Sequence, residues 1–174
     1  RKVAGSAPPL ADFAVEQACL FDSTQFSDMS ISSGGGITAW AWDFGDGNTS
    51  ALQHPVHAYG ALGTYNVSLV VTDYSGCTDT IVKTLSVEQA PTAAFTYHQP
   101  CQPPGMVFLY DSSFVQPGAA PITQWLWEIE PGYFSSEINP AYTFEAFDTC
   151  YVVALTVTDA NGCSNTRYDS VCVV

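Results

Sequence analysis

Apolar and polar positions alternate along much of this chain with a period of two. Trp40, Trp42 and Phe44 are separated by Ala41 and Asp43, and a similar alternation runs through 65–72. A period of two is typical of half-buried β-strands, because successive side chains point to opposite faces of a sheet. Turn-forming segments separate these runs, and no helical face is present. The pattern therefore predicts an all-β protein.

The alternating runs form two similar halves. Residues 63–77 align with 149–163 at an offset of 86, and 37–42 align with 122–127 at an offset of 85. We therefore predict two β-sandwich units, residues 1–88 and 89–174. The strands expected in the first unit are 10–16, 23–30, 37–44, 49–52, 56–59, 63–73 and 78–87. Those expected in the second are 92–98, 105–113, 122–130, 134–137, 141–145, 149–159 and 164–173.

Composition narrows the range of partners. The 174 residues include 4 Lys and Arg against 17 Asp and Glu, which gives a formal net charge of −13. Nucleic-acid binders usually present a basic face, and anionic membranes attract cations, so neither partner is expected. No apolar run approaches the ~20 residues that span a bilayer. The first residues lack both Met and an apolar signal core, which favours a processed end or a piece of a longer protein.

Six cysteines without metal-type spacing indicate disulfides formed in an oxidising, extracellular compartment. Two pairs are predicted from the repeat, because two cysteine positions of the first unit recur in the second. The third pair is predicted because its members lie equally far from an Asn-Gly turn, where antiparallel strands would bring them together. The predicted pairs are Cys19–Cys77, Cys101–Cys163 and Cys150–Cys172.

The first unit carries an ordered set of motifs that resembles the PKD (polycystic kidney disease-type) domain. These motifs are Trp40-Ala41-Trp42-Asp43-Phe44-Gly45-Asp46-Gly47, His54-Pro55-Val56-His57-Ala58-Tyr59, Gly63-Thr64-Tyr65-Asn66-Val67-Ser68-Leu69 and Val71-Thr72-Asp73. The second unit keeps most of them but has 128–132, Glu-Ile-Glu-Pro-Gly, at the central motif. The resemblance covers residues ~9–174. It implies two tandem immunoglobulin-like β-sandwiches that act as extracellular spacer or interaction modules.

Four aromatic residues are expected to be structural. Trp42 and Trp127 match the tryptophan that fills the core of immunoglobulin domains. Tyr65 and Tyr151 lie near the start of a late strand, where a tyrosine corner fits. Alternation places these rings on the inner face, so we expect core packing rather than carbohydrate stacking.

The acidic residues of the first unit suggest one candidate cofactor. Some PKD modules bind calcium, and the resemblance makes Asp43 and Asp73 the candidate ligands, since carboxylate oxygens suit this ion. The alternative is that Asp46 and Asp73 accept hydrogen bonds from backbone amides in their own turns. No other cofactor is expected, because the spacing of His54 and His57 does not favour zinc.

The sequence predicts no enzymatic activity. It contains no Gly-x-Ser-x-Gly motif and no histidine with a clear acid partner. Three hydroxyl residues, Ser23, Thr80 and Ser170, follow aspartate and resemble O-glycosylation acceptors of Bacteroidetes. The cysteine pattern likewise resembles large secreted or surface adhesins of that group.

The expected function is therefore a non-catalytic extracellular spacer or adhesion module of a longer secreted or surface-anchored bacterial protein. It would present neighbouring domains of the same chain away from the cell. One alternative is an accessory module of a secreted hydrolase that binds a polysaccharide or protein polymer. That alternative predicts a row of exposed aromatic residues on one sheet face, and the candidates are Tyr74, Tyr110, Phe114, Tyr133 and Phe134. A second alternative is a subunit of a surface filament, built by strand addition at exposed edges.

Overall fold

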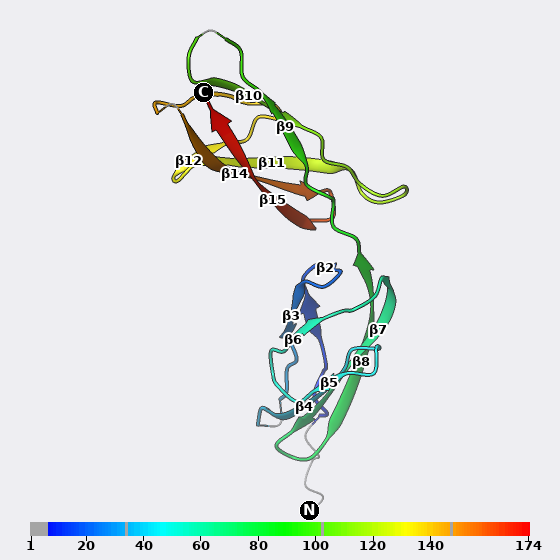
Figure 1. Ribbon diagram of the computed structural model, residues 1–174. Helices are drawn as coiled ribbons and strands as arrows, with labels where there is room; N and C mark the ends of the chain where they lie inside the picture. The colour runs from blue at the N-terminus through cyan, green and yellow to red at the C-terminus, as the bar shows by residue number, and fades with distance from the viewer. Residues whose placement is uncertain (1–6, 34, 102, 147) are drawn as a thin grey trace, which may run out of the picture. The chain divides into compact units, whose positions relative to one another are not determined.

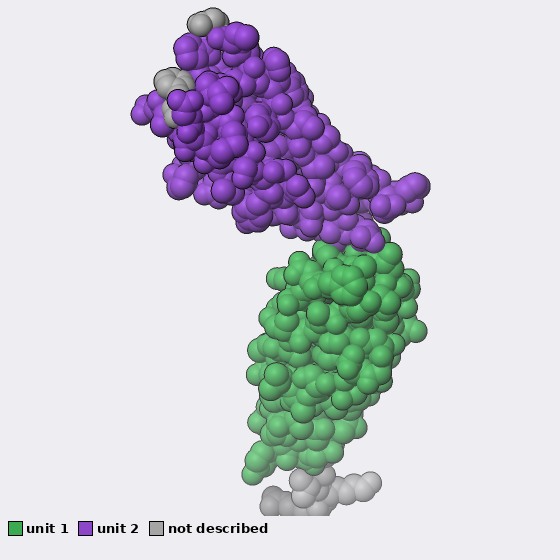
Figure 2. All heavy atoms as spheres, in the orientation of Figure 1, with its two compact units in different colours: residues 1–88 green, residues 89–174 purple. Residues whose placement is uncertain are grey.

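The computed structural model describes residues 7–33, 35–101, 103–146 and 148–174. The chain divides into two compact units, Arg1–Glu88 and Gln89–Val174 (Figure 2). Both units consist of β-strands, and the described residues contain no helix. The predicted all-β class is therefore confirmed. Correspondingly, no described segment is a helix long and apolar enough to cross a membrane.

Unit 1 contains two sheets (Figure 1). A three-stranded sheet has the order β1-β3-β6, and a five-stranded sheet has the order β2-β8-β7-β4-β5. The strands are β1 (Phe13–Val15), β2 (Ala18–Cys19), β3 (Ser23–Asp28), β4 (Ile37–Asp43), β5 (Thr49–Ser50), β6 (Val56–Ala58), β7 (Gly63–Asp73) and β8 (Thr78–Glu88). All pairings are antiparallel except that of β2 with β8.

Unit 2 repeats this arrangement with a three-stranded sheet, β13-β10-β9, and a four-stranded sheet, β12-β11-β14-β15 (Figure 1). The strands are β9 (Phe95–His98), β10 (Met106–Asp111), β11 (Ile122–Glu130), β12 (Tyr133–Ser135), β13 (Ala141–Thr143), β14 (Thr149–Asp159) and β15 (Ser164–Val173). Among the described residues of unit 2, no strand corresponds to β2.

Several strand boundaries differ from the predicted ones. The predicted strand 10–16 is observed as an isolated bridge between Leu10 and Ile31, followed by the three residues of β1. In unit 2 the corresponding segment forms a bridge at Thr92 before β9 begins. Strand β2 was not predicted, because its two residues are too few to show a period.

The core of each unit lies between its two sheets. In unit 1 the ring of Trp42 from β4 meets the edges of Phe13 and Phe26 from the facing sheet, with centroids 5.2 and 5.8 Å apart. In unit 2 Trp127 meets Phe95 at 5.1 Å. Trp42 and Trp127 are 1% and 0% exposed. The two tryptophans therefore occupy the core as predicted, and inward alternation along β4 and β11 explains their position.

Each buried tryptophan also satisfies its polar atom. The indole Nε1 of Trp42 donates a hydrogen bond to the carbonyl oxygen of Leu52 at 2.8 Å, and that of Trp127 donates to Glu137 at 2.9 Å. An unpaired N–H in the core would cost free energy. These bonds therefore fix the segment that follows β5 or β12 against the core.

The predicted tyrosine corners are present in both units. The hydroxyl of Tyr65 donates to the carbonyl oxygen of Ala61 at 2.9 Å, and that of Tyr151 donates to Ala146 at 3.2 Å. Both rings are half-buried and pack against the core of their unit. Each hydroxyl therefore ties the start of a long strand to the loop before it.

Candidate functional site

A polar cluster of unit 1 lies where the central motif meets β6. His57 Nε2 is 2.8 Å from Asp46 Oδ2, and these side chains are only 13% and 15% exposed. Phe44 stacks on the imidazole at 4.2 Å, and Tyr59 meets its edge at 4.7 Å. This ring is thus held by a carboxylate and two aromatic neighbours, an arrangement that fixes the turn rather than leaving a base open to a substrate.

Hydrogen bonds also govern the ionisation of Asp46. Burial opposes its charged form, but hydrogen bonds from Asn48 and His57 outweigh burial and lower the pKa of Asp46 below its ordinary value. The Asn48 amide donates to Asp46 Oδ1 at 3.0 Å. Gly45 allows this tight turn, because its φ is +82° and a Cβ there would lie 2.8 Å from the carbonyl oxygen of Asn66.

Unit 2 has a different pair at the corresponding place. The hydroxyl of Tyr142 on β13 donates to Glu130 Oε2 at the end of β11, at 2.8 Å. This bond, with burial and nearby negative charge, raises the pKa of Tyr142 to about 12. Tyr133 packs against Tyr142 with ring centroids 4.6 Å apart. The second unit therefore closes the same corner without histidine.

The structure does not bring the two predicted calcium ligands together. Asp73 pairs with Ile37 at one end of β4, whereas Asp43 pairs with Ser68 at the other end. Six residue steps along a strand correspond to ~20 Å. One ion bound by both Asp43 and Asp73 is therefore a wrong prediction. Among the described residues, no group of three or more His, Cys, Asp or Glu could hold a metal ion.

Asp43 and Asp73 instead act on their own turns. Asp43 Oδ1 accepts a hydrogen bond from the Gly45 amide at 2.8 Å. Asp73 is 1% exposed, and its Oδ1 accepts from the amides of Ser75 and Cys77 at 2.8 and 2.9 Å. The alternative interpretation of Asp73 and Asp46 as turn-stabilising residues is thus confirmed.

The same turn is built in unit 2. Asp159 is 3% exposed, and its Oδ1 accepts from the amides of Asn161 and Cys163, both at 2.9 Å. Within the part of the chain that the structure describes, the other oxygen, Oδ2, has no hydrogen-bond partner in Asp159 or in Asp73. Each of these two side chains therefore stabilises the turn of a long hairpin through Oδ1, while its Oδ2 is buried.

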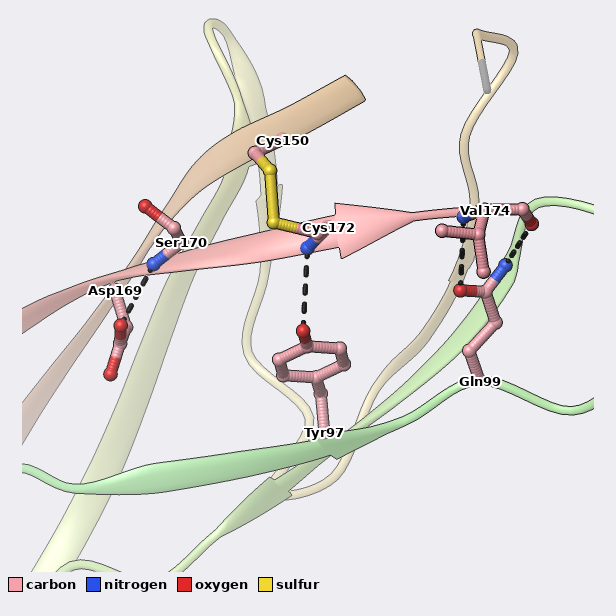
Figure 3. Close-up of a disulfide and its surroundings, with 7 residues drawn as sticks. All are labelled: Tyr97, Gln99, Cys150, Asp169, Ser170, Cys172 and Val174. Carbon is pink, nitrogen blue, oxygen red and sulfur yellow. Dashed lines mark hydrogen bonds between the residues drawn. A yellow bond between two sulfur atoms is a disulfide. The ribbon is translucent and has the colours of Figure 1, made fainter. Parts of the chain in front are cut away.

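The cysteines follow the prediction only in part. Cys150 and Cys172 form the predicted disulfide across β14 and β15, where they are paired residues (Figure 3). Figure 3 also shows the Cys172 amide donating to the hydroxyl of Tyr97, at 3.4 Å. Cys19 and Cys163 are each disulfide-bonded, whereas Cys77 and Cys101 are free thiols.

The predicted pairs Cys19–Cys77 and Cys101–Cys163 are therefore wrong, and strand length explains why. Cys19 is paired with Glu88 at the end of β8, while Cys77 precedes the first residue of β8, Thr78. Ten residue steps correspond to ~33 Å, but the Cα atoms of a disulfide lie within ~7 Å. The recurrence of these cysteines shows that they occupy equivalent positions in the two units. It does not show that the two cysteines of one unit lie close together.

Unit 2 keeps its equivalent pair apart in the same way. Cys163 precedes β15, and Cys101 follows Gln99, whose side chain bonds the backbone of Val174 just beyond β15 (Figure 3). The two bonds join Gln99 Nε2 to the Val174 oxygen at 2.8 Å and the Val174 nitrogen to Gln99 Oε1 at 3.3 Å. Cys101 and Cys163 thus lie at opposite ends of a ten-residue strand.

The exposed aromatic residues do not form the single row expected of a polymer-binding face. Tyr74 lies in the turn between β7 and β8, Tyr110 in β10, and Phe114 in a bridge with Thr92. Only Tyr133 and Phe134 share an element, β12. The candidates are thus spread over both units and over both sheets of unit 2.

One exposed aromatic residue on the outer face of unit 2 is not among the candidates predicted from the sequence. Tyr168 on β15 is 66% exposed and lies opposite Ala154, which pairs in turn with Glu128 and, beyond it, with Phe134. Outward alternation along the predicted strand 164–173 could have revealed it. A hollow of about 180 Å³ is lined by Tyr168, Ala154 and Glu128, among other residues.

The three predicted glycosylation residues, Ser23, Thr80 and Ser170, are all exposed. Exposure permits modification, and their glycosylation stays a prediction. The two cations in the described part of the chain bind aspartates. Lys83 Nζ lies 2.7 Å from Asp12, and the Arg167 guanidinium lies 2.9 Å from Asp169. Among the described residues, most of the acidic side chains thus have no Lys or Arg beside them.

Comparison with known proteins places both units in one family. The family model described as the PKD domain matches residues 6–88 and again residues 88–173. The chain belongs to the PKD domain family. Its two PKD domains are immunoglobulin-like β-sandwiches in tandem, as the motifs had suggested. The more specific resemblance to Bacteroidetes adhesins stays a prediction.

Relatives of these PKD domains occur in bacterial proteases. A microbial collagenase of Vibrio alginolyticus is 40% identical over 86 residues, which are 49% of this chain and 11% of the collagenase. The pre-pro-metalloprotease PrtV of Vibrio cholerae is 31% identical over 140 residues, 77% of this chain and 15% of PrtV. The chain therefore spans only a small fraction of each relative.

A solved structure is similar to one unit. The PKD1 domain of Vibrio anguillarum Epp is 35% identical, with a TM-score of 0.46, and the match covers 49% of this chain and 99% of that domain.

Proposed function

We propose that this chain is a non-catalytic, extracellular spacer within a longer bacterial protein, where its PKD domains hold neighbouring domains apart. The observation that carries the proposal is the use of the polar groups. His57 binds Asp46, Asp73 and Asp159 anchor turns, and Glu130 binds Tyr142. These groups stabilise the fold itself, which suits a module whose task is structural.

Three further features support the proposal. Tandem small sandwiches give reach, because each unit supplies its own core. A formal net charge of −13 opposes self-association. Disulfides are typical of proteins outside the cytosol, which favours secretion or surface anchoring. The segments that match this chain are small parts of a collagenase and a metalloprotease, which agrees with an accessory role.

A depletion assay tests the proposal. The oxidised chain would be incubated with collagen, chitin, cellulose and an agar-type polysaccharide, with calcium or with a chelator, and the unbound protein measured. We expect no saturable depletion on any polymer. Saturable depletion would contradict the spacer function and favour a polymer-binding module.

If a polymer does bind, two test variants and one control variant would locate its binding site. Phe134→Ala and Tyr168→Ala remove the two exposed rings at either side of Glu128, whereas Tyr74→Ala removes an exposed ring in a turn of unit 1. Binding that is lost in the first pair and kept in Tyr74→Ala would locate the polymer on the outer face of unit 2.

A further inference from the structure

Each PKD unit has two ends that are marked by cysteines. We call the end at which the chain comes into a unit its leading end. In unit 1 the amide of Ala11 binds Asp79 Oδ2 there at 2.8 Å, two residues from Cys77. In unit 2 the amide of Ala93 binds Asn165 Oδ1 at 3.0 Å, two residues from Cys163. Cys77 and Cys163 are therefore equivalent leading-end cysteines.

The opposite, trailing end is where the chain leaves a unit. In unit 1 Cys19 of β2 lies there, opposite Glu88, the last residue of the neighbouring strand β8. In unit 2 Cys101 lies two residues from Gln99, which binds Val174. Cys19 and Cys101 are therefore equivalent trailing-end cysteines.

Both kinds of cysteine form disulfides in this chain. The leading-end cysteine of unit 2, Cys163, is disulfide-bonded, and so is the trailing-end cysteine of unit 1, Cys19. Their equivalents in the other unit, Cys77 and Cys101, are the two free thiols. Each free thiol thus occupies a position that its counterpart shows to be suited to a disulfide.

Neither free thiol can reach the cysteine at the opposite end of its own unit, because a strand of ten residue steps, ~33 Å, lies between them. The other two cysteines of unit 2, Cys150 and Cys172, are already bonded to each other. Both thiols are nevertheless accessible, Cys101 being exposed and Cys77 half-buried. Beside Cys101 lies a hollow of about 250 Å³, whose lining includes Pro100, Pro104 and Val174. A partner sulfur must therefore come from outside the unit.

We infer that Cys77 and Cys101 are cross-linking sites for further PKD units of the longer protein. Cys77 bonds the trailing-end cysteine of a unit that precedes unit 1, and Cys101 bonds the leading-end cysteine of a unit that follows unit 2. Chain connectivity supports this choice, since a preceding unit must join at the leading end and a following one at the trailing end. The inference rests on the proposed spacer function and adds a covalent connection to it.

The bond forms by thiol–disulfide exchange with a small disulfide such as oxidised glutathione. The thiolate of Cys101 attacks one sulfur of the oxidant, and one glutathione thiolate leaves. The partner cysteine then attacks the mixed disulfide, and the second glutathione leaves. Two protein thiols are oxidised, and one oxidised glutathione is reduced to two thiols, so electrons and protons balance.

A fusion of two copies of the chain tests the inference. Val174 of the first copy is followed by Gln-Ala-Pro-Thr, the sequence of residues 89–92, and then by residues 11–174 of the second copy. This arrangement places Cys101 of the first copy before Cys77 of the second with the link length that joins units 1 and 2. After refolding with reduced and oxidised glutathione, free thiols are titrated in denaturant.

Each chain has two free thiols, so the fusion has 2 × 2 = 4 if no new bond forms. We expect two, and we expect non-reduced peptide mapping to find a bond between Cys101 and Cys77. Four free thiols would overturn the inference, as would a mapped bond between Cys19 and Cys77 or between Cys101 and Cys163.

Two Cys77→Ser variants of the fusion provide matched controls. In the second copy the substitution removes the partner of Cys101, so three thiols are expected. In the first copy it removes an uninvolved thiol, so one is expected. These counts are independent of the polymer assay, which means that polymer binding could contradict the spacer function while the cross-link forms.

Discussion

The two PKD units stabilise the same corner and the same long hairpin with different side chains. Unit 1 closes the corner between its central motif and β6 with the pair Asp46 and His57, and unit 2 uses Glu130 and Tyr142. Along the long hairpin, Thr64 and Ser86 face each other in unit 1, where unit 2 has a disulfide. Side-chain pairs thus vary between the units.

Contacts from side chains to backbone atoms are kept. Both buried tryptophans donate to a carbonyl oxygen, both tyrosine corners end on an alanine carbonyl, and both buried aspartates accept from turn amides. A backbone carbonyl oxygen or amide is present in nearly every residue type, so a substitution at that position leaves the contact intact. The comparison teaches that the fold depends on these shared contacts and tolerates loss of the central aspartate motif.

The largest effect is expected from the shared tryptophans. Trp42→Ala and Trp127→Ala should each lower the free energy of unfolding of their own unit by about 3–5 kcal/mol, because a buried ring and its hydrogen bond are lost. Amide hydrogen exchange followed by mass spectrometry would resolve the two units. A loss below about 1 kcal/mol in either unit would break the equivalence of their cores.

The disulfide of unit 2 should have the next largest effect. Cys150→Ser with Cys172→Ser should destabilise unit 2 by about 3 kcal/mol, since the bridge closes a loop of 22 residues. Thr64→Cys with Ser86→Cys should add a comparable bridge to unit 1. Both pairs would be measured by denaturant unfolding with Cys77→Ser and Cys101→Ser in the background. If the new bridge forms without stabilising unit 1, the hairpins are not equivalent.

The buried aspartates test whether the turns are equivalent. Asp73→Ala and Asp159→Ala should each cost about 2 kcal/mol, because two turn amides lose the carboxyl oxygen that accepts their hydrogen bonds. Asp73→Asn and Asp159→Asn keep one acceptor oxygen and should cost less. Urea unfolding gives both values, and a difference of more than about 1 kcal/mol between the alanine variants would show that only one turn needs its carboxylate.

Acid should affect the corner of unit 1. The depressed pKa of Asp46 means that its contribution to stability is present above its ordinary value of 3.8 and is lost as pH falls through the lower folded-state pKa. When the pH falls from about 5 to about 2, the free energy of unfolding of unit 1 should therefore decrease less in Asp46→Asn than in the original chain. The difference should be up to about 1 kcal/mol. Unfolding measured across this range by hydrogen exchange would check it, and an unchanged slope would contradict the assigned role.

Alkali should affect the corner of unit 2, with an effect of similar size. The pKa of Tyr142 is raised to about 12, so its contribution is full below its ordinary value of 10 and is lost as pH rises through about 12. Tyr142→Phe should lower stability at neutral pH by about 1 kcal/mol and flatten the alkaline decline of unit 2. Tyr133→Phe, which leaves the bond to Glu130 intact, is the control, and equal effects of the two variants would sink the prediction.

Much of the fold follows from local pattern. Alternation located the long strands, and the Asn161-Gly162 turn placed Cys150 opposite Cys172, because an antiparallel hairpin fixes its own register. The other cysteine pairs failed, since repetition along the chain says nothing about which end of a sandwich a residue occupies. The calcium site failed for a similar reason, because Asp43 and Asp73 are separated by the length of β4.

The parallel pairing of β2 with β8 has a mechanical consequence. β2 belongs to the first part of unit 1 and β8 to its last, and the two strands run side by side in the same direction. A force that pulls the ends of this unit apart therefore acts along both strands in opposite senses. The bonds between them are loaded in shear and must break together rather than one after another. The short strand β2, which lies beside the end of β8, thus helps unit 1 to resist stretching.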